Sequence, residues 1–567
     1  MKNPLVAELL FKIADLLEMQ EKKFEPIAYR NAARTIEGMS KDIENEWKEG
    51  RLYEIPGVGR GIGEKIEEFL VKGRSDYYDE LKKKMPMDVD ALLNIEGLGS
   101  KKVMVLYKKL KIKNIADLKK AAEAKKIQKL EGFGEKSEQK ILHAIEVSSK
   151  STGRMLLGFA LPIAEEIVED LRSSGLAGNV SIAGSTRRMK ETIGDLDVLV
   201  TSSKPAEVAD YFCKMKSVQD VLAKGSTRSS VRLVNGLQVD LRVLPESEYG
   251  SALMYFTGSK EHNVALRKIA ISNKMKLSEY GLFKANKKIA GKTEEEVYAA
   301  LKMDYIPPEI RENTGEIELA LKKNLPKLVE RKDILCDLQM HTKWSDGANS
   351  VEEMAAKAAQ IGHKYIAVTD HAGPLKIANS MDEKRLKKYC EEIDKISKKS
   401  PIHILKGAEV DILKDGSLGI QDSALKLLDI VLVSIHSNFL LPKEEMTKRL
   451  LKAMDNKYTC IIAHPTGRKL KIKESYALDF DKIYEKAKSR NIALEIDCHP
   501  ERTDLNDAGV RAAVEAGVKL SIGTDSHAAG QLDFIRCGIG TARRGWASQK
   551  DIINTMQLEK MMKFFGR

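Results

Sequence analysis

Residues 184–200 read GSTRRMKETIGDLDVLV, and this stretch decides how we interpret the rest of the chain. Its last six residues combine alternating polarity with β-branched side chains, which predicts a strand with Asp195 and Asp197 on one face. A second strand-like run at 238–244, QVDLRVL, carries a third acid, Asp240, between apolar neighbours. Carboxylates that share a face repel each other unless a cation lies between them. We therefore expect the three acids to gather on neighbouring strands around metal ions.

Three carboxylates make a hard, oxygen-rich site of the kind that Mg²⁺ prefers, with water and substrate phosphate as further ligands. Two such ions about 3.5–4 Å apart hold the attacking and leaving oxygens of a phosphoryl displacement. The turn at Gly184 and Ser185 offers a backbone N–H and a hydroxyl to a phosphate, and Arg187 or Arg188 adds a bidentate donor. The alternative interpretation of the Asp-x-Asp pair, taken alone, is a solvated turn.

Length and composition limit the class of protein. The chain has 567 residues, 43% of them hydrophobic and 31% charged, which indicates three or four soluble domains. The net charge of +12 favours a polyanionic partner. Six cysteines lie far apart with no CxxC pair, a pattern typical of reduced thiols in the cytoplasm. Charged residues interrupt the apolar stretch 1–19, so it predicts an amphipathic helix rather than a signal peptide or membrane span.

A short motif repeats three times in the first 150 residues: an apolar residue, a G-x-G turn and a helix that carries lysines. The six glycines are Gly57, Gly59, Gly97, Gly99, Gly132 and Gly134. Glycine permits backbone angles that other residues resist, and the helix N-terminus behind the turn brings N–H groups close to an anion. Such a turn binds a nucleic-acid phosphate without reading a base. The repeats resemble helix-hairpin-helix motifs, which implies DNA-backbone binding; the alternative is αα-hairpins that only pack.

The longer pattern GS-x-RR…GD-x-D…D resembles the nucleotidyltransferase palm, and in detail the family X group of DNA polymerases around polymerase beta. The resemblance continues at 255–259, YFTGS, a segment that in this family packs against the sugar of the incoming nucleotide and discriminates against ribose. It implies that Asn263 touches the nucleotide and Arg267 the template strand. The nucleotide contacts that it implies are Gly184, Ser185, Arg188, Gly194, Tyr255, Phe256, Gly258 and Asn263. Lys260 departs from the family, because close relatives of polymerase beta carry an acid there.

The first repeat also resembles the small domain of polymerase beta. Residues 63–70, GEKIEEFL, match the helix whose lysine forms a Schiff base with an abasic sugar, and Lys65 takes that lysine's place. Residues 28–33, AYRNAA, resemble a second helix of the same domain. A lysine nucleophile must be neutral, which requires desolvation or neighbouring cations. The alternative role for Lys65 is a contact with a DNA phosphate.

The second half of the chain is organised differently. Short apolar runs alternate with helical stretches such as 351–361 and 383–399, which predicts a parallel sheet. Several runs end in a potential metal ligand, and in a closed α/β barrel these ligands would meet at one mouth. The candidates are His341, Asp346, His371, Glu409, His436, His464, Asp525 and His527. One histidine after a strand is usually a satisfied polar residue, but the group as a whole predicts a metal centre.

This half resembles the PHP (polymerase and histidinol phosphatase) domain at 337–342, DLQMHT, at 369–371, TDH, and at 525–527, DSH. In that family a distorted barrel holds up to three metals and hydrolyses phosphoesters. The metal sets that the resemblance implies are His341 with Glu409 and Asp525, Glu409 with His436 and His464, and Asp346 with His371 and His527. Gln339 departs from the family's HxH motif and would be a poorer ligand at the first metal. Mixed imidazole and carboxylate ligands suit Mn²⁺, Zn²⁺ or Fe²⁺.

The resemblance covers essentially the whole chain and implies a multidomain α/β protein. An N-terminal all-α helix-hairpin-helix region, an α+β nucleotidyltransferase palm and a C-terminal distorted α/β barrel would follow one another along the chain. The expected domains are 1–85, a small helical domain; 86–150, a second helix-hairpin-helix region; 151–245, the palm; 246–318, a nucleotide-selection subdomain; 319–332, a linker; and 333–567, the PHP domain.

The expected function is a family X DNA polymerase that fills short gaps during repair with Mg²⁺ or Mn²⁺, and whose tail removes nucleotides or blocking groups from 3′ ends. Abasic-site incision and a lyase step at Lys65 would extend that chemistry. The expected partners are gapped or primer-template DNA and dNTPs, bound by a cytoplasmic monomer without a membrane segment. Two alternatives stay open: a nucleotidyltransferase fused to a small-molecule phosphatase, and a DNA-binding scaffold with inactive sites. The G-x-G repeats argue against the first. The intact aspartates argue against the second for the polymerase centre, while Gln339 leaves it open for the tail.

Overall fold

The computed structural model describes residues 3–37, 39, 42–93, 95, 98–150 and 153–567. The chain divides into two compact units. The first unit comprises Met1–Thr152, Cys336–Ile483 and Thr524–Asp533, and the second Gly153–Leu335, Tyr484–Gly523 and Phe534–Arg567. Residues of the C-terminal region therefore belong to both units. Within the described residues, no helix has the length and the apolar character needed to cross a membrane.

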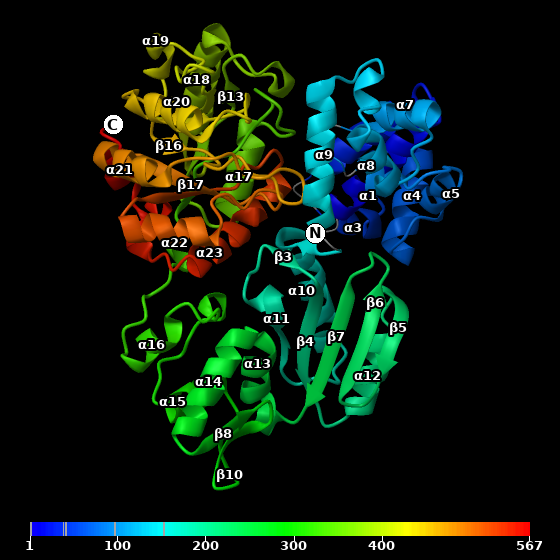
Figure 1. The fold of residues 1–567 in the computed structure, drawn as a ribbon, viewed down its shortest axis with the longest axis vertical. Coiled ribbons are helices and arrows are strands. Elements are labelled where there is room, and N and C mark those ends of the chain that lie inside the picture. The colour runs from blue at the N-terminus through cyan, green and yellow to red at the C-terminus, as the bar shows by residue number, and fades with distance from the viewer. Residues whose placement is uncertain (1–2, 38, 40–41, 94, 96–97, 151–152) are drawn as a thin grey trace. The chain divides into compact units, whose positions relative to one another are not determined.

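The first unit begins with a helical region (Figure 1). Its helices are α1 (Asn3–Met19), α2 (Glu25–Glu37), α3 (Ile43–Lys48), η1 (Leu52–Glu54), α4 (Arg60–Lys72), α5 (Asp76–Lys83), α6 (Val89–Leu93), α7 (Ser100–Leu110), α8 (Ile115–Glu123), η2 (Ile127–Lys129) and α9 (Glu135–Lys150). The apolar stripe predicted for α1 is confirmed, because Leu10 and Ile13 are fully buried in the core of this region. The G-x-G turns precede α4, α7 and α9, as the helix-hairpin-helix pattern predicts, although Gly97 lies outside the described residues.

The second unit contains a five-stranded sheet in the order β2-β4-β7-β6-β5. Its strands are β2 (Val180–Ile182), β4 (Asp195–Thr201), β5 (Val218–Lys224), β6 (Arg228–Leu233) and β7 (Gln238–Leu244). β4 and β7 run parallel, and the other neighbours run antiparallel. Leu196, Val198 and Val200 of β4 pack in one core with α10 (Leu157–Ser173) and α12 (Pro205–Cys213), which lie along the sheet (Figure 1). The strands predicted at 195–200 and 238–244 are thus confirmed.

The opposite face of this sheet is covered by α13 (Tyr249–Thr257), whose Ala252 and Leu253 pack against Leu199 of β4. Because side chains alternate along a strand, Asp195 and Asp197 share this face with Leu199. The remaining elements up to the barrel are β1 (Met155–Leu156), α11 (Gly184–Arg187), β3 (Thr192–Ile193), η3 (Glu246–Glu248), α14 (Lys260–Ser272), β8 (Met275–Ser278), β9 (Gly281–Lys284), β10 (Lys287–Ala290), α15 (Glu294–Ala300), η4 (Pro308–Ile310), α16 (Glu316–Leu321) and η5 (Arg331–Asp333). The acids therefore lie on the side of the sheet where α11 and α13 meet it.

The C-terminal region forms a nearly closed barrel of parallel strands in the order β11-β12-β14-β15-β16-β17-β18, with β13 beside β14. The strands are β11 (Cys336–Asp337), β12 (Tyr365–Val368), β13 (His371–Ala372), β14 (His403–Asp411), β15 (Ile430–Ser434), β16 (Ile461–Ile462), β17 (Ala493–Asp497) and β18 (Leu520–Gly523). The helices are α17 (Val351–Gln360), η6 (Lys376–Ala378), α18 (Glu383–Ser397), α19 (Asp422–Leu425), α20 (Lys443–Asp455), α21 (Phe480–Arg490), α22 (Asp507–Ala516), η7 (Ala529–Phe534), α23 (Ile535–Arg544), η8 (Gln549–Asp551), η9 (Ile553–Thr555) and α24 (Leu558–Phe564). The alternation of strand and helix predicted from the sequence is confirmed.

Candidate active sites

The first candidate site lies on the face of the five-stranded sheet that carries the acids. Asp197 and Asp240 stand directly opposite each other in the parallel register of β4 and β7, and Asp195 lies two residues before Asp197 on the same strand. Burial, followed by the negative charges of Asp195 and Asp240, raises the pKa of Asp197 to about 7. The three carboxylates are therefore close enough to repel one another, and a bound cation would relieve that repulsion.

Asp240 is held by its neighbours on the sheet. Ser230 Oγ donates to Asp240, Gln238 Nε2 donates to it over 3.2 Å, and Arg228 Nη2 lies 3.7 Å from its Oδ2. In the described part of this unit, no three acids or histidines have ligand atoms that all lie within 4.8 Å of one another. The three carboxylates thus share one face of the sheet, but their oxygen atoms do not all lie within 4.8 Å of one another.

Gly184 brings the turn after β2 against these acids. Its φ is +60°, and a side chain there would place Cβ within 3.0 Å of Asp197 Oδ2. Glycine is therefore required both by the backbone conformation and by the close approach. Ser185 follows at the start of α11 and is half-buried. At Gly194 a Cβ would meet only the Arg154 guanidinium, with Nη1 at 2.9 Å, the far end of a flexible side chain that can shift, so the structure does not demand glycine there as it does at Gly184.

The two arginines that follow the turn have different partners. Arg187 Nη1 and Nη2 donate to the two carboxylate oxygens of Glu294 over 2.9 and 2.6 Å, and Nη1 also donates to Thr257 Oγ1 over 2.7 Å. Arg188 Nε donates to Glu312 Oε1 over 3.1 Å, while its Nη1 donates to the carbonyl of Thr257. Arg187 is thus used within the fold, and Arg188 is the better candidate for a phosphate contact.

The YFTGS segment lies at the end of α13, next to Arg188. Gly258 has a φ of +70°, and a Cβ there would lie 3.1 Å from Arg188 Nη1. The rings of Tyr255 and Phe256 meet edge to face with centroids 5.1 Å apart. Asn263 Nδ2 donates to the carbonyl of Tyr255 over 2.7 Å. The YFTGS segment therefore contacts both Arg188 and Asn263, two residues predicted to bind the nucleotide.

Two further positions of α14 that the sequence singles out are exposed. Arg267 is exposed, and its Nε donates to the Asn263 carbonyl over 3.4 Å. Lys260, the departure from the family pattern, is exposed at the start of the helix.

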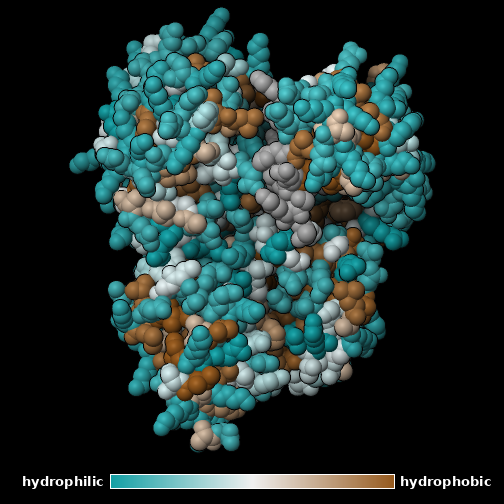
Figure 2. Space-filling view, in the orientation of Figure 1, coloured by the Kyte–Doolittle hydropathy of each residue, from teal (hydrophilic) through white to brown (hydrophobic). Residues whose placement is uncertain are grey.

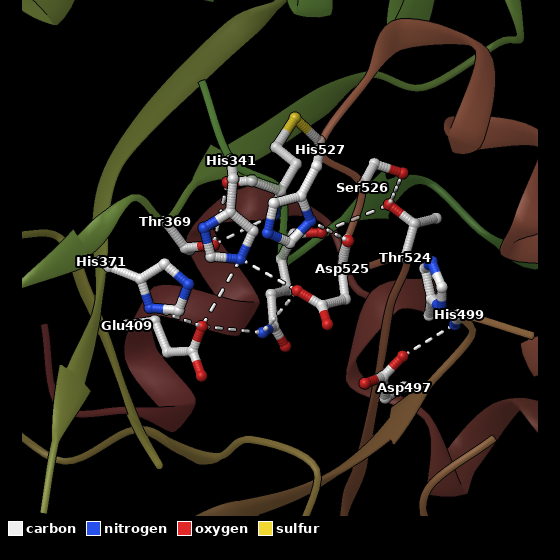
Figure 3. Close-up of polar contacts among 12 residues, drawn as sticks. His341, Thr369, His371, Glu409, Asp497, His499, Thr524, Asp525, Ser526 and His527 are labelled. Carbon is white, nitrogen blue, oxygen red and sulfur yellow. Dashed lines mark hydrogen bonds and ion pairs between the residues drawn. The ribbon is translucent and has the colours of Figure 1, made fainter. Parts of the chain in front are cut away.

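The second candidate site gathers histidines and acids at the carboxyl ends of the barrel strands, all in the first unit (Figure 3). Three groups in the described part of the chain have ligand atoms that all lie within 4.8 Å of one another: His341, Asp346, His371 and His527; His371, Glu409 and His436; and His341, Glu409 and Asp525. The first and third groups contain two of the predicted metal sets. In the second group His371 takes the place predicted for His464, although His464 Nε2 lies only 2.9 Å from Glu409 Oε1.

Glu409 lies at the centre of this site. Its carboxylate oxygens lie 3.4 Å from His341 Nε2, 3.4 Å from His371 Nδ1 and 3.2 Å from His436 Nε2. Burial raises the pKa of Glu409, but the surrounding histidines outweigh burial and hold it well below its usual range. The His341 and His527 rings stack with centroids 4.3 Å apart, and Figure 3 shows them next to each other beside Glu409. A buried carboxylate surrounded by imidazoles is the chemistry of a transition-metal site.

Gln339 and Asp411 act on this site in ways that the sequence did not reveal. The buried Gln339 amide nitrogen donates to Glu409 Oε2 over 3.3 Å and to Asp525 Oδ1 over 3.4 Å. Asp411 Oδ1 lies 2.8 Å from His436 Nδ1. Burial lowers the pKa of His436, but Glu409 and Asp411 outweigh it and raise the value to about 9. The position of Asp411 two residues after Glu409 on β14 is the signal that could have identified it.

Five glycines of the N-terminal G-x-G turns are exposed: Gly57, Gly59, Gly99, Gly132 and Gly134. Gly57 and Gly132 have φ values of +85° and +81°, which glycine adopts readily. Gly59 and Gly99 are the N-caps of α4 and α7. On the face drawn in Figure 2, the N-terminal helices are covered largely by hydrophilic side chains. Lys65 on α4 is half-buried, with Nζ 5.1 Å from the centroid of the Tyr77 ring.

Four family descriptions and several known proteins match this chain. The matching family descriptions are helix-hairpin-helix domain (residues 1–75), SAM-like helix-hairpin-helix tandem (89–146), DNA polymerase beta thumb (252–312) and PHP domain (337–499). The chain is 38% identical to the DNA polymerase/3′-5′ exonuclease PolX of Bacillus subtilis over 99% of each chain. It is 25% identical to DNA polymerase lambda of Rattus norvegicus, over 49% of this chain and 48% of that one. A probable phosphatase of Clostridium acetobutylicum is 31% identical over 34% of this chain and 79% of its own length.

Proposed function

Because this chain belongs to the family X DNA polymerases that carry a C-terminal PHP domain, we propose that it fills short DNA gaps with one metal-dependent centre and trims 3′ ends with another. The observation that carries the first part is the register that places Asp197 opposite Asp240, with the Gly184 turn packed against Asp197. The observation that carries the second part is the set of three histidine and carboxylate groups around Glu409.

In the polymerase centre, Asp195, Asp197 and Asp240 would hold two Mg²⁺ or Mn²⁺ ions, for which a set of carboxylate oxygens is well suited. Such ions, when bound, supply the positive charge that offsets charge on the phosphoryl oxygens. The primer 3′-hydroxyl would attack the α-phosphate of a dNTP and expel pyrophosphate. Ser185 and Arg188 would bind the triphosphate by donating from a hydroxyl and a guanidinium.

The YFTGS segment and α14 would hold the rest of the substrate. Tyr255, Phe256 and Gly258 would face the sugar of the dNTP. Asn263 would contact the nucleotide, supported by its bond to the Tyr255 carbonyl. Arg267, exposed on α14, would contact the template strand.

In the PHP centre, the three groups would hold up to three ions of Mn²⁺, Zn²⁺ or Fe²⁺, because mixed imidazole and carboxylate donors fit these metals. The ions, when bound, supply Lewis acidity toward a phosphodiester and its attacking water. Asp411 would orient the His436 ring, as carboxylates behind metal-bound histidines do. Gln339 would hold Glu409 and Asp525 in place rather than ligate a metal, because its amide nitrogen faces both carboxylates.

DNA binding by the helix-hairpin-helix regions brings both centres to the same class of substrate. We assign the phosphate contacts to the G-x-G turns, and either a phosphate contact or a Schiff base to Lys65. The domain boundaries expected from the sequence, the use of dNTPs and a monomeric state belong to the same proposal. A salt titration tests the DNA contact, since binding through phosphate contacts releases counterions and the affinity therefore falls steeply as the salt concentration rises.

The test of the two activities uses a labelled primer on DNA with a one-nucleotide gap, with Mn²⁺ and with or without dNTPs. We expect lengthening of the primer with dNTPs and stepwise shortening from its 3′ end without them. Hydrolysis of a small phosphate monoester without any change to the DNA would instead support the fusion of a nucleotidyltransferase with a small-molecule phosphatase.

A further inference from the structure

Arg544, the last residue of α23, reaches the polymerase residues of its own unit. Its Nη1 donates to the main-chain carbonyl of Arg188 over 2.8 Å and to Glu312 Oε1 over 3.0 Å. Its Nε donates to Asp507 Oδ2 over 3.0 Å. The Arg544 side chain is only 4% exposed, so these bonds form away from bulk water. Arg544 and Arg188 are separated by 356 positions, and no local sequence pattern links them.

Glu312 connects Arg544 to the guanidinium of Arg188. The same oxygen, Oε1, lies 3.1 Å from Arg188 Nε, 3.4 Å from Lys190 Nζ and 3.0 Å from Arg544 Nη1. Burial raises the pKa of Glu312, but Arg188, Arg544 and Lys190 outweigh burial and leave it below its usual range. Glu312 is therefore an anion at neutral pH, and three cations share its charge.

The bonds of Arg188 determine what it can offer to a nucleotide. An arginine side chain has five N–H donors. Arg188 uses Nε toward Glu312 and one Nη1 hydrogen toward the Thr257 carbonyl, which leaves donors on Nη1 and Nη2 for a phosphate. The guanidinium orientation therefore depends on where Glu312 lies and on where the Arg188 main chain is held. Arg544 controls both, because it binds the Glu312 carboxylate and the Arg188 carbonyl at once.

We propose that Arg544 is a positioning residue of the polymerase centre, which orients Arg188 for the triphosphate of the incoming dNTP. This inference rests on the proposed role of Arg188 as a triphosphate contact. Without Arg544, the Glu312 charge would be shared by Arg188 and Lys190 alone, so the carboxylate would hold the Arg188 guanidinium more tightly. The Arg188 carbonyl would also lose a charge-assisted donor. The C-terminal region would thus set nucleotide affinity in addition to carrying its own centre.

The test measures KM for dNTP and kcat for primer extension in the full-length protein. We expect Arg544→Ala to raise KM about tenfold, the effect of losing charge-assisted hydrogen bonds. We expect kcat to change less than about twofold, because the interaction is made equally in the ground and transition states. Arg544→Lys keeps the charge but not the fork of donors, so its KM should lie between those of wild type and Arg544→Ala.

The matched control is Arg536→Ala. Arg536 lies on the same helix and also pairs with a glutamate outside it, Glu165, but both of these side chains are 44% exposed, in contrast to the 4% exposed Arg544. We expect Arg536→Ala to leave KM at the wild-type value. Shortening of a primer without dNTPs and the thermal unfolding curve show that each variant is folded. A wild-type KM in folded Arg544→Ala and Arg544→Lys would overturn the inference.

The variant Arg188→Ala separates this inference from the function that it rests on. Arg188→Ala should raise KM at least as much as Arg544→Ala. If Arg188→Ala leaves KM unchanged, the role of Arg188 is wrong and the inference fails with it. If Arg188→Ala raises KM and Arg544→Ala does not, only the inference is wrong. In the double variant Arg544→Ala/Glu312→Gln, the rise in KM should be smaller than the product of the single effects, because both act through one carboxylate. A rise in KM equal to the product of the two single effects would mean that Arg544 and Glu312 act independently, and it would contradict the role of the Glu312 carboxylate.

Discussion

Replacing Glu294 by Gln should destabilise the unit that carries the polymerase centre. The Glu294 carboxylate is buried and pairs with Arg187 and with Arg311, whose Nη1 lies 2.6 Å from Oε1 and whose side chain is fully buried. Burial raises the pKa of Glu294, but Arg311 and Arg187 outweigh it and lower the value from 4.5 to about 2. That lowering corresponds to about 3 kcal/mol of stability. Gln would also leave the Arg311 charge buried without an anion, so we expect a loss of about 3–5 kcal/mol.

Hydrogen exchange of the α15 amides measures this loss locally, which suits a protein with several domains. The control is Glu169→Gln. Glu169 pairs with Arg172, which is 56% exposed, so this substitution should lower the free energy of unfolding by less than about 0.5 kcal/mol. The Glu294 contribution is present above pH 4.5 and is lost as the pH falls through about 2. The difference in exchange free energy between wild type and Glu294→Gln should therefore shrink on acidification. Equal exchange in both glutamine variants at neutral pH would refute the reasoning.

Three other predictions concern the two centres. Gly184→Ala should abolish primer extension and spare primer shortening. The alanine Cβ would lie within 3.0 Å of Asp197 Oδ2, and the residue has a φ of +60°, which alanine rarely adopts. Extension at the wild-type rate would contradict this prediction, because it would show that the turn can relax. Asp411→Asn weakens the bond to His436 Nδ1 and should slow primer shortening about 10- to 100-fold without affecting extension. Both activities are measured on one labelled primer, and loss of both would contradict this prediction. Mg²⁺ binding below about pH 7 should release a proton from Asp197, whose pKa is about 7, and the release should fade at higher pH. Calorimetry in two buffers with different ionisation enthalpies measures the release, and heats that do not depend on the buffer would count against it.

Local patterns in the sequence were sufficient for much of the fold. Alternating side chains placed Asp195 and Asp197 on one face of a strand, and the run at 238–244 became β7. The helix expected at 383–399 became α18. These predictions succeed because the period of the side chains and the start of a helix depend on neighbours in the chain. The functional roles of the site residues stay predictions until they are measured.

Contacts between distant positions could not be predicted in this way. Arg187 and Arg188 are neighbours in the sequence, and only the fold shows that Arg187 pairs with Glu294, 107 positions away, and Arg188 with Glu312, 124 positions away. The same holds for the grouping of metal ligands, where the register of β13 and β14 places His371 beside Glu409. The fold also shows that the Gln339 amide faces two carboxylates, a relation that spacing alone did not reveal.

The central claim is that one chain carries two independent metal-dependent centres, one that builds phosphodiesters and one that breaks them. The most direct test compares Asp240→Ala and His436→Ala on the labelled primer in gapped DNA with Mn²⁺. We predict that Asp240→Ala loses lengthening and keeps shortening, and that His436→Ala does the reverse. If either substitution removes both activities from a folded protein, the two centres are not independent and the claim is wrong.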